Sequence, residues 1–447
     1  MNPKYAVPAF LGRNNFASRG PDVNSAITTL LYEMEEGLVR DPSNPPGQGP
    51  ALDMIPTWAV PPESSPKSKS VIVIDAGGTN FRTCLVHFDA DGKPEITDMR
   101  KTAMPATDRE YGKKEFFETI ASNLDYLKDK ADRIGFCFSY PMSITPDGDG
   151  KVIQFSKEIK AKEAIGSLVG ASLSEALVSR GWKKPSKIVL LNDTAAALLA
   201  GASAATGGKA YDSYVGFILG TGMNAAYIEY GKIAKLADAE GNVPSSQIVV
   251  CESGKCNKIA RSSFDESLDK TTTAPGFFGY EKMCSGAYLG PLGRIALSRA
   301  AEDGLFSDAV TPSFAKLEAL ELKDMDQFFY GPYRTDTRLG AILAKGSETD
   351  REIAFRILDA FVERSARLAA ANIAAVIIKS GKGTNPARPV SVLCEGTTFL
   401  RTHNLRERVV GYLNAVLTEE RGIWYEIVTM DNAVTLGSAV ACLISRP

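Results

Sequence analysis

Histidine is scarce in this chain, because the 447 residues include only His87 and His403. The usual general base at neutral pH is therefore nearly missing, and a carboxylate is the better candidate for acid-base chemistry. The seven cysteines are scattered singly, and no Cys-x-x-Cys pair or Cys/His cluster has the spacing of a zinc site. Free thiols of this kind predict a reducing, cytoplasmic location.

The chain also lacks an excess of charge, since 51 basic against 53 acidic residues give a formal net charge of -2. No basic block indicates a nucleic-acid or membrane partner. No run of about 18 apolar residues occurs, and the first residues, MNPKYAVPAF, contain no apolar core of a secretory signal. We therefore expect a small-molecule ligand, with no nucleic acid and no membrane as partner.

What the chain does contain is an alternation of short apolar runs and helical periodicity. The expected strands are 71–74, 81–88, 134–138, 188–191, 214–219, 225–229, 247–250 and 390–393. Helical spacing marks residues 27–38, and the longest helix is expected to open with a capping box at Thr349 and to end near Gly381. The pattern predicts an α/β protein, and the length predicts two or three domains with a cleft between them. A Pro-rich stretch, 41–70, is expected to be a connector.

Two of these apolar runs are joined by Asp75-Ala76-Gly77-Gly78-Thr79-Asn80. Two glycines let backbone N–H groups approach a phosphate, and an aspartate can hold a hydrated Mg²⁺. The alternative is a polar hairpin turn, which needs neither the acid nor the Thr-Asn pair. The segment is not a Walker A loop, because no Gly-Lys-Ser/Thr follows. We interpret it as a polyphosphate-binding loop.

A second glycine loop, Leu219-Gly220-Thr221-Gly222-Met223-Asn224, also lies between two expected strands. Alone it would be typical of an ordinary tight turn. Paired with the first loop, it could hold a nucleotide tail from the opposite side.

An acid, Asp193, follows a buried-looking strand and precedes an alanine-rich helix, in Asn192-Asp193-Thr194. Helix N-capping is an equally good reading of these three residues, and the two roles are compatible. The carboxyl end of a strand at a domain junction is where α/β proteins commonly place catalytic groups.

Further polar residues follow other apolar runs. Ser139 ends a strand, Ser156 stands beside Lys157, and Glu252 and Glu281 each lie near a glycine. Carboxylates suit a polyhydroxylated ligand, because each oxygen can accept bonds from neighbouring hydroxyls. Taken singly, the serines are typical of loop chemistry and Glu281 of a solvated helix residue.

With these residues in hand, the sequence resembles the eukaryotic-type hexokinase family. The similar segments occur in order: 54–57, 75–82, 138–141, 191–194, 220–225, 274–290, 364–379 and 394–398. The resemblance implies the two-domain actin-like ATPase (ribonuclease H-like) fold with an inter-domain cleft. We expect a small domain of residues 60–192 plus 434–447 and a large domain of residues 1–59 plus 193–433.

The resemblance implies transfer of a phosphoryl group from MgATP to the 6-hydroxyl of a hexose. D-glucose is the first candidate for this hexose, and glycolysis is the expected pathway. Asp193 would be the general base, Lys157 would assist, and the domains would close on the sugar. The residues implied around the hexose are Ser139, Ser156, Lys157, Asn192, Asp193, Asn224, Glu252 and Glu281. The residues implied to face ATP are Asp75, Gly77, Gly78, Thr79, Asn80, Arg82, Gly220, Thr221, Gly222, Gly396 and Thr397, with Asp75 holding Mg²⁺ through water.

Two segments depart from the family pattern. Ser156-Lys157-Glu158-Ile159 stands where Thr-Lys-Gly-Phe is usual, and Glu252-Ser253-Gly254 where Glu-Trp-Gly is usual. These changes leave the preferred hexose open, as the sequence leaves open whether the protein is a monomer or a homodimer. The alternatives are a repressor-type sugar kinase, which usually carries a cysteine-rich zinc motif, a sugar sensor without useful turnover, and an actin-like ATPase that works through partners.

Overall fold

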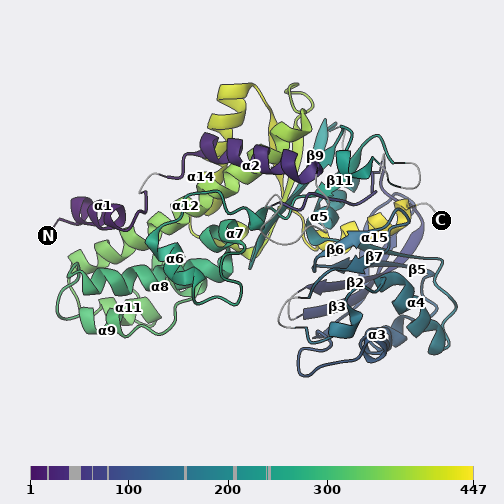
Figure 1. The fold of residues 1–447 in the computed structure, drawn as a ribbon, viewed down its shortest axis with the longest axis horizontal. Helices are drawn as coiled ribbons and strands as arrows, with labels where there is room; N and C mark the ends of the chain where they lie inside the picture. The colour runs from purple at the N-terminus through teal and green to yellow at the C-terminus, as the bar shows by residue number, and fades with distance from the viewer. Residues whose placement is uncertain are drawn as a thin grey trace.

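The computed structural model describes residues 2–17, 20–39, 52–62, 64–77, 80–155, 159–204, 209–237, 239 and 243–445. The chain forms two lobes, each built on its own β-sheet (Figure 1). One lobe, with the C-terminus, holds β2, β3, β5, α3 and α4, and the other holds α12 and a group of helices around it. Within the described residues no helix is both long and apolar enough to cross a membrane.

The first sheet has the order β4-β3-β2-β5-β8 and the second has the order β1-β11-β10-β9-β12-β13. The strands of the first are β2 Lys69–Gly77, β3 Asn80–Phe88, β4 Pro94–Ala103, β5 Arg133–Phe138 and β8 Lys187–Leu191. The strands of the second are β1 Ile55–Pro56, β9 Ser213–Leu219, β10 Met223–Glu229, β11 Gln247–Val250, β12 Val390–Glu395 and β13 Tyr425–Val428. A small hairpin pairs β6 Met142–Ile144 with β7 Gly150–Val152.

The two sheets share one design. In the first, β4, β3 and β2 pair antiparallel and then β5 and β8 pair parallel. In the second, β11, β10 and β9 pair antiparallel and then β12 and β13 pair parallel. The connection after the last parallel strand of each sheet is a helix: α5 (Asp193–Ser203) follows β8, and α15 (Ala433–Ile444) follows β13.

These two helices cross over to the other sheet. α5 packs against β9 and β12, whereas α15 packs against β5 and β2, and the two helices contact each other. Gly437 and Gly135 permit this approach, because a Cβ at either position would collide with backbone of α5 or α15. The apolar layer between the sheets includes Leu198 and Val440, both fully buried. The residue that starts α5 therefore lies where the two sheets meet.

The remaining helices surround these sheets. They are α1 Pro3–Arg13, α2 Val23–Val39, α3 Lys113–Ser122, α4 Val169–Ser179, α6 Ser263–Asp269, α7 Gly279–Cys284, α8 Gly286–Glu302, α9 Thr311–Ala315, α10 Leu322–Tyr330, α11 Arg338–Leu343, α12 Glu348–Ser380, α13 Thr397–Arg401 and α14 Leu405–Leu413. Short 3₁₀ turns are η1 Asp125–Leu127, η2 Lys162–Ala164, η3 Ala234–Leu236 and η4 Ser253–Lys255, and η5 Asn414–Glu419 is a π-helical turn.

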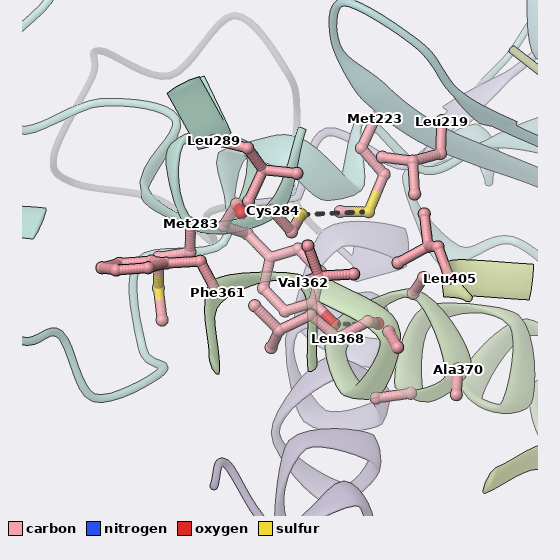
Figure 2. Close-up of a cluster of buried hydrophobic side chains, with 14 of the residues drawn as sticks. Leu219, Met223, Met283, Cys284, Leu289, Phe361, Val362, Leu368, Ala370 and Leu405 are labelled. Atoms are coloured by element: carbon pink, nitrogen blue, oxygen red, sulfur yellow. Dashed lines mark hydrogen bonds between the residues drawn. The ribbon is translucent and has the colours of Figure 1, made fainter. Parts of the chain in front are cut away.

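The long helix α12 forms the spine of the larger lobe. Its alanine-rich stretch 368–377 is buried, because small side chains let β10, α7 and α8 approach closely. Figure 2 shows part of this core, where the Cys284 thiol points at the Met223 sulfur, 3.6 Å away, above Leu368. Truncating a buried leucine such as Leu368 to alanine typically costs about 2–5 kcal/mol of stability. This core supports the turn that precedes Met223.

The expected strands are present, with some differences at the ends of elements. The N-cap of α12 is Ser347, which forms a capping box with Asp350, so the prediction that the box opens at Thr349 was wrong by two residues. The helix does end at Gly381, which has a left-handed backbone (φ 65°). The connector contains the short strand β1, and β4 was missed because most of its residues are exposed on both faces.

Candidate active site

The first glycine segment is the bend of the β2–β3 hairpin. Asp75 pairs with Arg82 across the ladder, and Gly77 pairs with Asn80. The expectation of a loop beginning at Asp75 was therefore wrong, because the ladder continues to Gly77 and only two residues join the strands. Those two residues, Gly78 and Thr79, and the side chain of Asn80 lie outside the described residues. A hairpin bend and a phosphate site are compatible readings of this segment.

Asp193 is the first residue of α5, directly after the parallel strand β8 and its cap. Asn192 is the N-cap, since its Oδ1 accepts the Thr194 backbone N–H at 2.9 Å, and Asp193 Oδ1 accepts the same N–H at 2.8 Å. Burial, together with the negative charges of Asp75 and Glu395, raises the pKa of Asp193 to about 6, although the N–H of Thr194 acts in the opposite direction. The side chain of Ser139 also lowers the pKa of this carboxylate.

A cavity of about 270 Å³ joins this carboxylate to the first bend. It is lined by Asp75, Gly77, Arg82, Ser139, Asp193, Ile218, Glu395, Gly396, Asn432, Val434 and Thr435. The lining residues come from both sheets and from α5 and α15, so the cavity lies at the junction of the lobes.

Two carboxylates and one cation dominate one side of this cavity. Arg82 Nη1 lies 3.4 Å from Asp75 Oδ2. Burial raises the pKa of Asp75, and the charge of Arg82 opposes that rise. Burial likewise raises the pKa of Glu395, the negative charge of Asp75 adds to it, and Arg82 lowers it. Among the described residues, the buried Glu395 Oε2 has no hydrogen-bond partner.

Glu395 lies in segment 394–398, one of those similar to the hexokinase family, but its sequence context alone predicted no role for it. The available signal was its position: it ends a buried parallel strand, β12, immediately before Gly396. The adjacent Thr397, predicted to face ATP, is an exposed residue at the start of α13 and does not line the cavity.

The second glycine bend is held by two other segments. It joins β9 to β10, and the Gly220 N–H donates to Gly222 O at 2.9 Å. The Gly286 N–H at the start of α8 and the Thr398 hydroxyl both donate to Gly220 O, at 2.8 and 2.9 Å. Gly396 has φ 107°, and a Cβ there would collide with the carbonyl of the residue before Gly220. The second bend therefore lies against the Gly396 turn, one wall of the cavity.

Past this bend, three polar side chains predicted to bind the hexose form one group. Asn224 Nδ2 donates to Glu252 Oε1 at 3.0 Å. The Met223 N–H donates to Glu281 Oε2 at 3.1 Å, so Glu281 is not the solvated helix residue that its local sequence suggested. A Cβ at Gly222 would lie 2.5 Å from Glu281 Oε2, so a larger residue there would displace this carboxylate.

Both of these carboxylates are partly withdrawn from water. Burial raises the pKa of Glu252 to about 7 and that of Glu281 to about 7. The charge of Asp193 contributes to the shift in Glu252, and the charge of Glu252 contributes to the shift in Glu281. Asp193 thus interacts electrostatically with Asp75 on one side and with Glu252 on the other. Ser156 and Lys157 lie outside the described residues, and their roles stay predictions.

Comparison with known proteins assigns the chain to a family. Two family models, both described as hexokinase, match residues 13–203 and 214–444. The chain belongs to the hexokinase family. It is an ATP-dependent hexose phosphotransferase, as the resemblance in the sequence indicated.

Hexokinases from fungi and plants are similar along most of the chain. Hexokinase-1 of Schizosaccharomyces pombe is 27% identical over 432 residues, which cover 92% of this chain and 85% of that protein. Hexokinase-5 of Oryza sativa is 30% identical over 385 residues, which cover 80% of this chain and 72% of that protein.

Solved hexokinase structures confirm the actin-like ATPase fold. The hexokinase of Schistosoma mansoni, complexed with glucose, superposes with a TM-score of 0.78 at 22% identity and covers 99% of both chains. A second hexokinase crystal structure gives a TM-score of 0.80 at 20% identity and covers 98% of both chains.

Proposed function

We propose that this hexokinase transfers the γ-phosphoryl group of MgATP to the 6-hydroxyl of a hexose, with D-glucose as the first candidate, and that Asp193 is the general base. The observation that carries this proposal is the position of Asp193, a carboxylate with a pKa of about 6 between two groups of polar residues. The choice of D-glucose is supported by the glucose complex of the Schistosoma mansoni relative.

We assign one group to each substrate. The nucleotide side comprises Asp75, Arg82, Glu395 and Gly396, with the second bend behind Gly396. The hexose side comprises Asn224, Glu252 and Glu281. Backbone N–H groups at glycine bends suit phosphates, whereas buried carboxylates suit hydroxyl donors. With ATP on one side and hexose on the other, the attacking hydroxyl would lie at Asp193.

The nucleotide side fits a magnesium ion. Mg²⁺ keeps several waters and is usually held by one or two carboxylates together with substrate phosphates. Asp75 is such a carboxylate, and the unpartnered Glu395 Oε2 offers a second oxygen. Bound with ATP, the ion would neutralise charge on the phosphate oxygens.

Asp193 has the properties that a base for this reaction needs. At pH 7 a carboxyl group with a pKa of about 6 is mostly ionised, yet it accepts a proton more readily than a solvated aspartate. It would orient the 6-hydroxyl and take its proton as the bond to phosphorus forms. Ser139 and the Thr194 N–H would hold the carboxylate in place.

We also propose that the two lobes act as domains that close on the hexose. The division into residues 60–192 plus 434–447 and residues 1–59 plus 193–433 is supported by the packing of α15 on the five-stranded sheet and of α5 on the six-stranded sheet. Closure would exclude water, which otherwise competes with the sugar for the phosphoryl group. Lys157 stays a predicted source of positive charge for the transferring group. A cytoplasmic location is supported by the seven cysteines, all of which are free and buried.

A coupled ADP-release assay across a panel of hexoses, with a control that contains no sugar, tests the proposal. We expect hexose-dependent turnover with D-glucose among the best substrates, product phosphorylated at the 6-position, and ATP hydrolysis without sugar at least about 10²-fold slower. Glucose binding without turnover would instead identify a sugar sensor. Sugar-independent ATP hydrolysis would identify an ATPase that works through partners.

A further inference from the structure

One of the two departures from the family pattern makes a specific buried contact. Ser253 follows Glu252 directly in the chain and is 1% exposed. Asn372 Nδ2, on helix α12, donates a hydrogen bond to Ser253 Oγ at 2.8 Å, and Asn372 is 2% exposed. This bond joins the turn that carries Glu252 to the spine of the larger lobe.

The turn at Glu252 needs such support. Glu252 has a left-handed backbone (φ 55°, ψ 42°), which residues with a Cβ rarely adopt and which persists only where surrounding contacts enforce it. Three contacts enforce it. The Ser253 N–H donates to Asn224 Oδ1 at 3.3 Å, the Lys255 N–H donates to Glu252 O at 3.0 Å, and Asn372 holds the Ser253 side chain.

Helix α12 is a rigid support for this contact. The residues on either side of Asn372, Ala371 and Ile373, are fully buried, and the Tyr280 hydroxyl donates to the Leu368 carbonyl at 2.7 Å one turn earlier. A polar side chain in such a stretch is costly unless it is hydrogen-bonded. Of the three hydrogen bonds named above, the one from Asn372 comes from a residue that belongs neither to the turn nor to the hexose side.

We propose that Asn372 and Ser253 are positioning residues that fix the Glu252 carboxylate for hexose binding. The inference rests on the proposed role of Glu252 as a hexose acceptor. Neither residue is assigned to touch a substrate, so their effect acts through the turn. Loss of the bond should weaken the hexose complex and leave phosphoryl transfer at saturating hexose nearly unchanged.

The test compares Asn372→Leu, Ser253→Ala and the double variant with wild type. D-glucose affinity is measured by calorimetry without nucleotide, and KM and kcat by the coupled assay. Because one neutral hydrogen bond is lost, we expect the glucose Kd and KM to rise about three- to tenfold, with kcat within about twofold and the ATP KM unchanged. The double variant should be no worse than either single variant.

A matched control is Ser380→Ala, which removes a buried hydroxyl bonded to Ile377 O at the C-terminal end of the same helix, about two turns from Asn372, and should leave the glucose Kd unchanged. An unchanged glucose Kd in Asn372→Leu or in Ser253→Ala overturns the inference. The inference is also overturned if the increases in glucose Kd add in the double variant. It is likewise overturned if kcat falls and the KM values for glucose and ATP rise by the same factor.

Glu252→Gln separates this inference from the proposed function. If Glu252→Gln leaves the glucose Kd unchanged, the assignment of Glu252 to the hexose side is wrong, and the positioning inference fails with it. If Glu252→Gln weakens glucose binding and Asn372→Leu does not, only the positioning inference fails.

Discussion

The proposed nucleotide side and the proposed hexose side both hold two carboxylates that are withdrawn from water, but different groups stabilise the carboxylates on each side. Asp75 and Glu395 share the cation Arg82, which lowers the pKa of both. Glu252 accepts a hydrogen bond from the neutral amide of Asn224, and Glu281 accepts one from a backbone N–H. Lys255 does lower the pKa of Glu252, but it is ion-paired with Asp53, whose charge acts in the opposite direction.

This difference matches the chemistry expected on each side. A carboxylate that meets a metal ion and phosphates must stay ionised, and a nearby cation favours the ionised form. A carboxylate that meets sugar hydroxyls needs free acceptor oxygens, and desolvation makes each bond to them stronger. Asp193 belongs to neither arrangement, since it interacts with acids on both sides.

The largest effect is expected where the two sides meet, at Asp193. Asp193→Asn keeps the shape of the side chain and removes the base, so kcat should fall about 10²- to 10⁴-fold while the glucose Kd changes only a few-fold. In the wild type, kcat/KM should rise with pH through about 6 as the carboxyl group ionises, and the variant should lack this rise. Steady-state kinetics from pH 5 to 8 measure both quantities.

Asp91→Asn provides the control for this substitution, because Asp91 is an exposed acid in the turn between β3 and β4. It should leave kcat and the pH profile unchanged. Near wild-type kcat in Asp193→Asn would remove Asp193 from the mechanism and leave the two sides without a common base.

A smaller effect is expected from removing the cation that distinguishes the nucleotide side. Arg82→Met leaves Asp75 and Glu395 without the charge that lowers their pKa values, so both should be protonated more readily. Arg82 is itself about half exposed, at 47%, so we expect the KM for MgATP and the Mg²⁺ requirement to rise about two- to fivefold at pH 6 and less at pH 8. Binding of a fluorescent ATP analogue and kinetics at both pH values test this.

The matched control is Arg100→Met, which removes an exposed arginine of the neighbouring strand β4 and should leave nucleotide binding unchanged. The glucose Kd should not change in Arg82→Met. If Arg82→Met weakens glucose binding and nucleotide binding equally, the two sides are not electrostatically independent, and the comparison between them is wrong.

Local patterns predicted much of the fold, because the central strands of both sheets are buried runs and the ends of α12 carry recognisable caps. They failed for β4, whose exposed residues look like a loop, and at the first bend, where pairing between Asp75 and Arg82 extends the strands. Such pairing depends on the partner strand, which a local pattern does not contain.

The residues of the site likewise fall into those that local sequence predicted and those that it did not. The acid at Asp193 was predicted from its place between a strand and a helix, and that place is found in the structure. Glu395 received no role, although its position at the end of a strand was a signal, and its missing hydrogen bond is visible only in three dimensions. The contact between Ser253 and Asn372 joins residues 119 positions apart, so no local pattern could indicate it.

The smallest effect concerns stability. It tests whether the cost of burying ionised Glu252 and Glu281 on the hexose side is left uncompensated. Glu252 and Glu281 have pKa values of about 7 in the folded protein, above the value of 4.5 for a free glutamate. Between these values the folded protein binds more protons than the unfolded chain, so its stability falls as pH rises from about 5 to 8. The doubly substituted variant Glu252→Gln/Glu281→Gln should therefore melt about 2–4 °C higher than wild type at pH 8, with the gap closing towards pH 5.

Asp265, whose pKa is lowered against burial by its ion pair with Arg364, gives the opposite case, because Asp265→Asn should lower the melting temperature across this range. Scanning fluorimetry without hexose measures all three proteins. A gap that is constant with pH would mean that neutral donors already compensate Glu252 and Glu281 as fully as Arg82 compensates the other side.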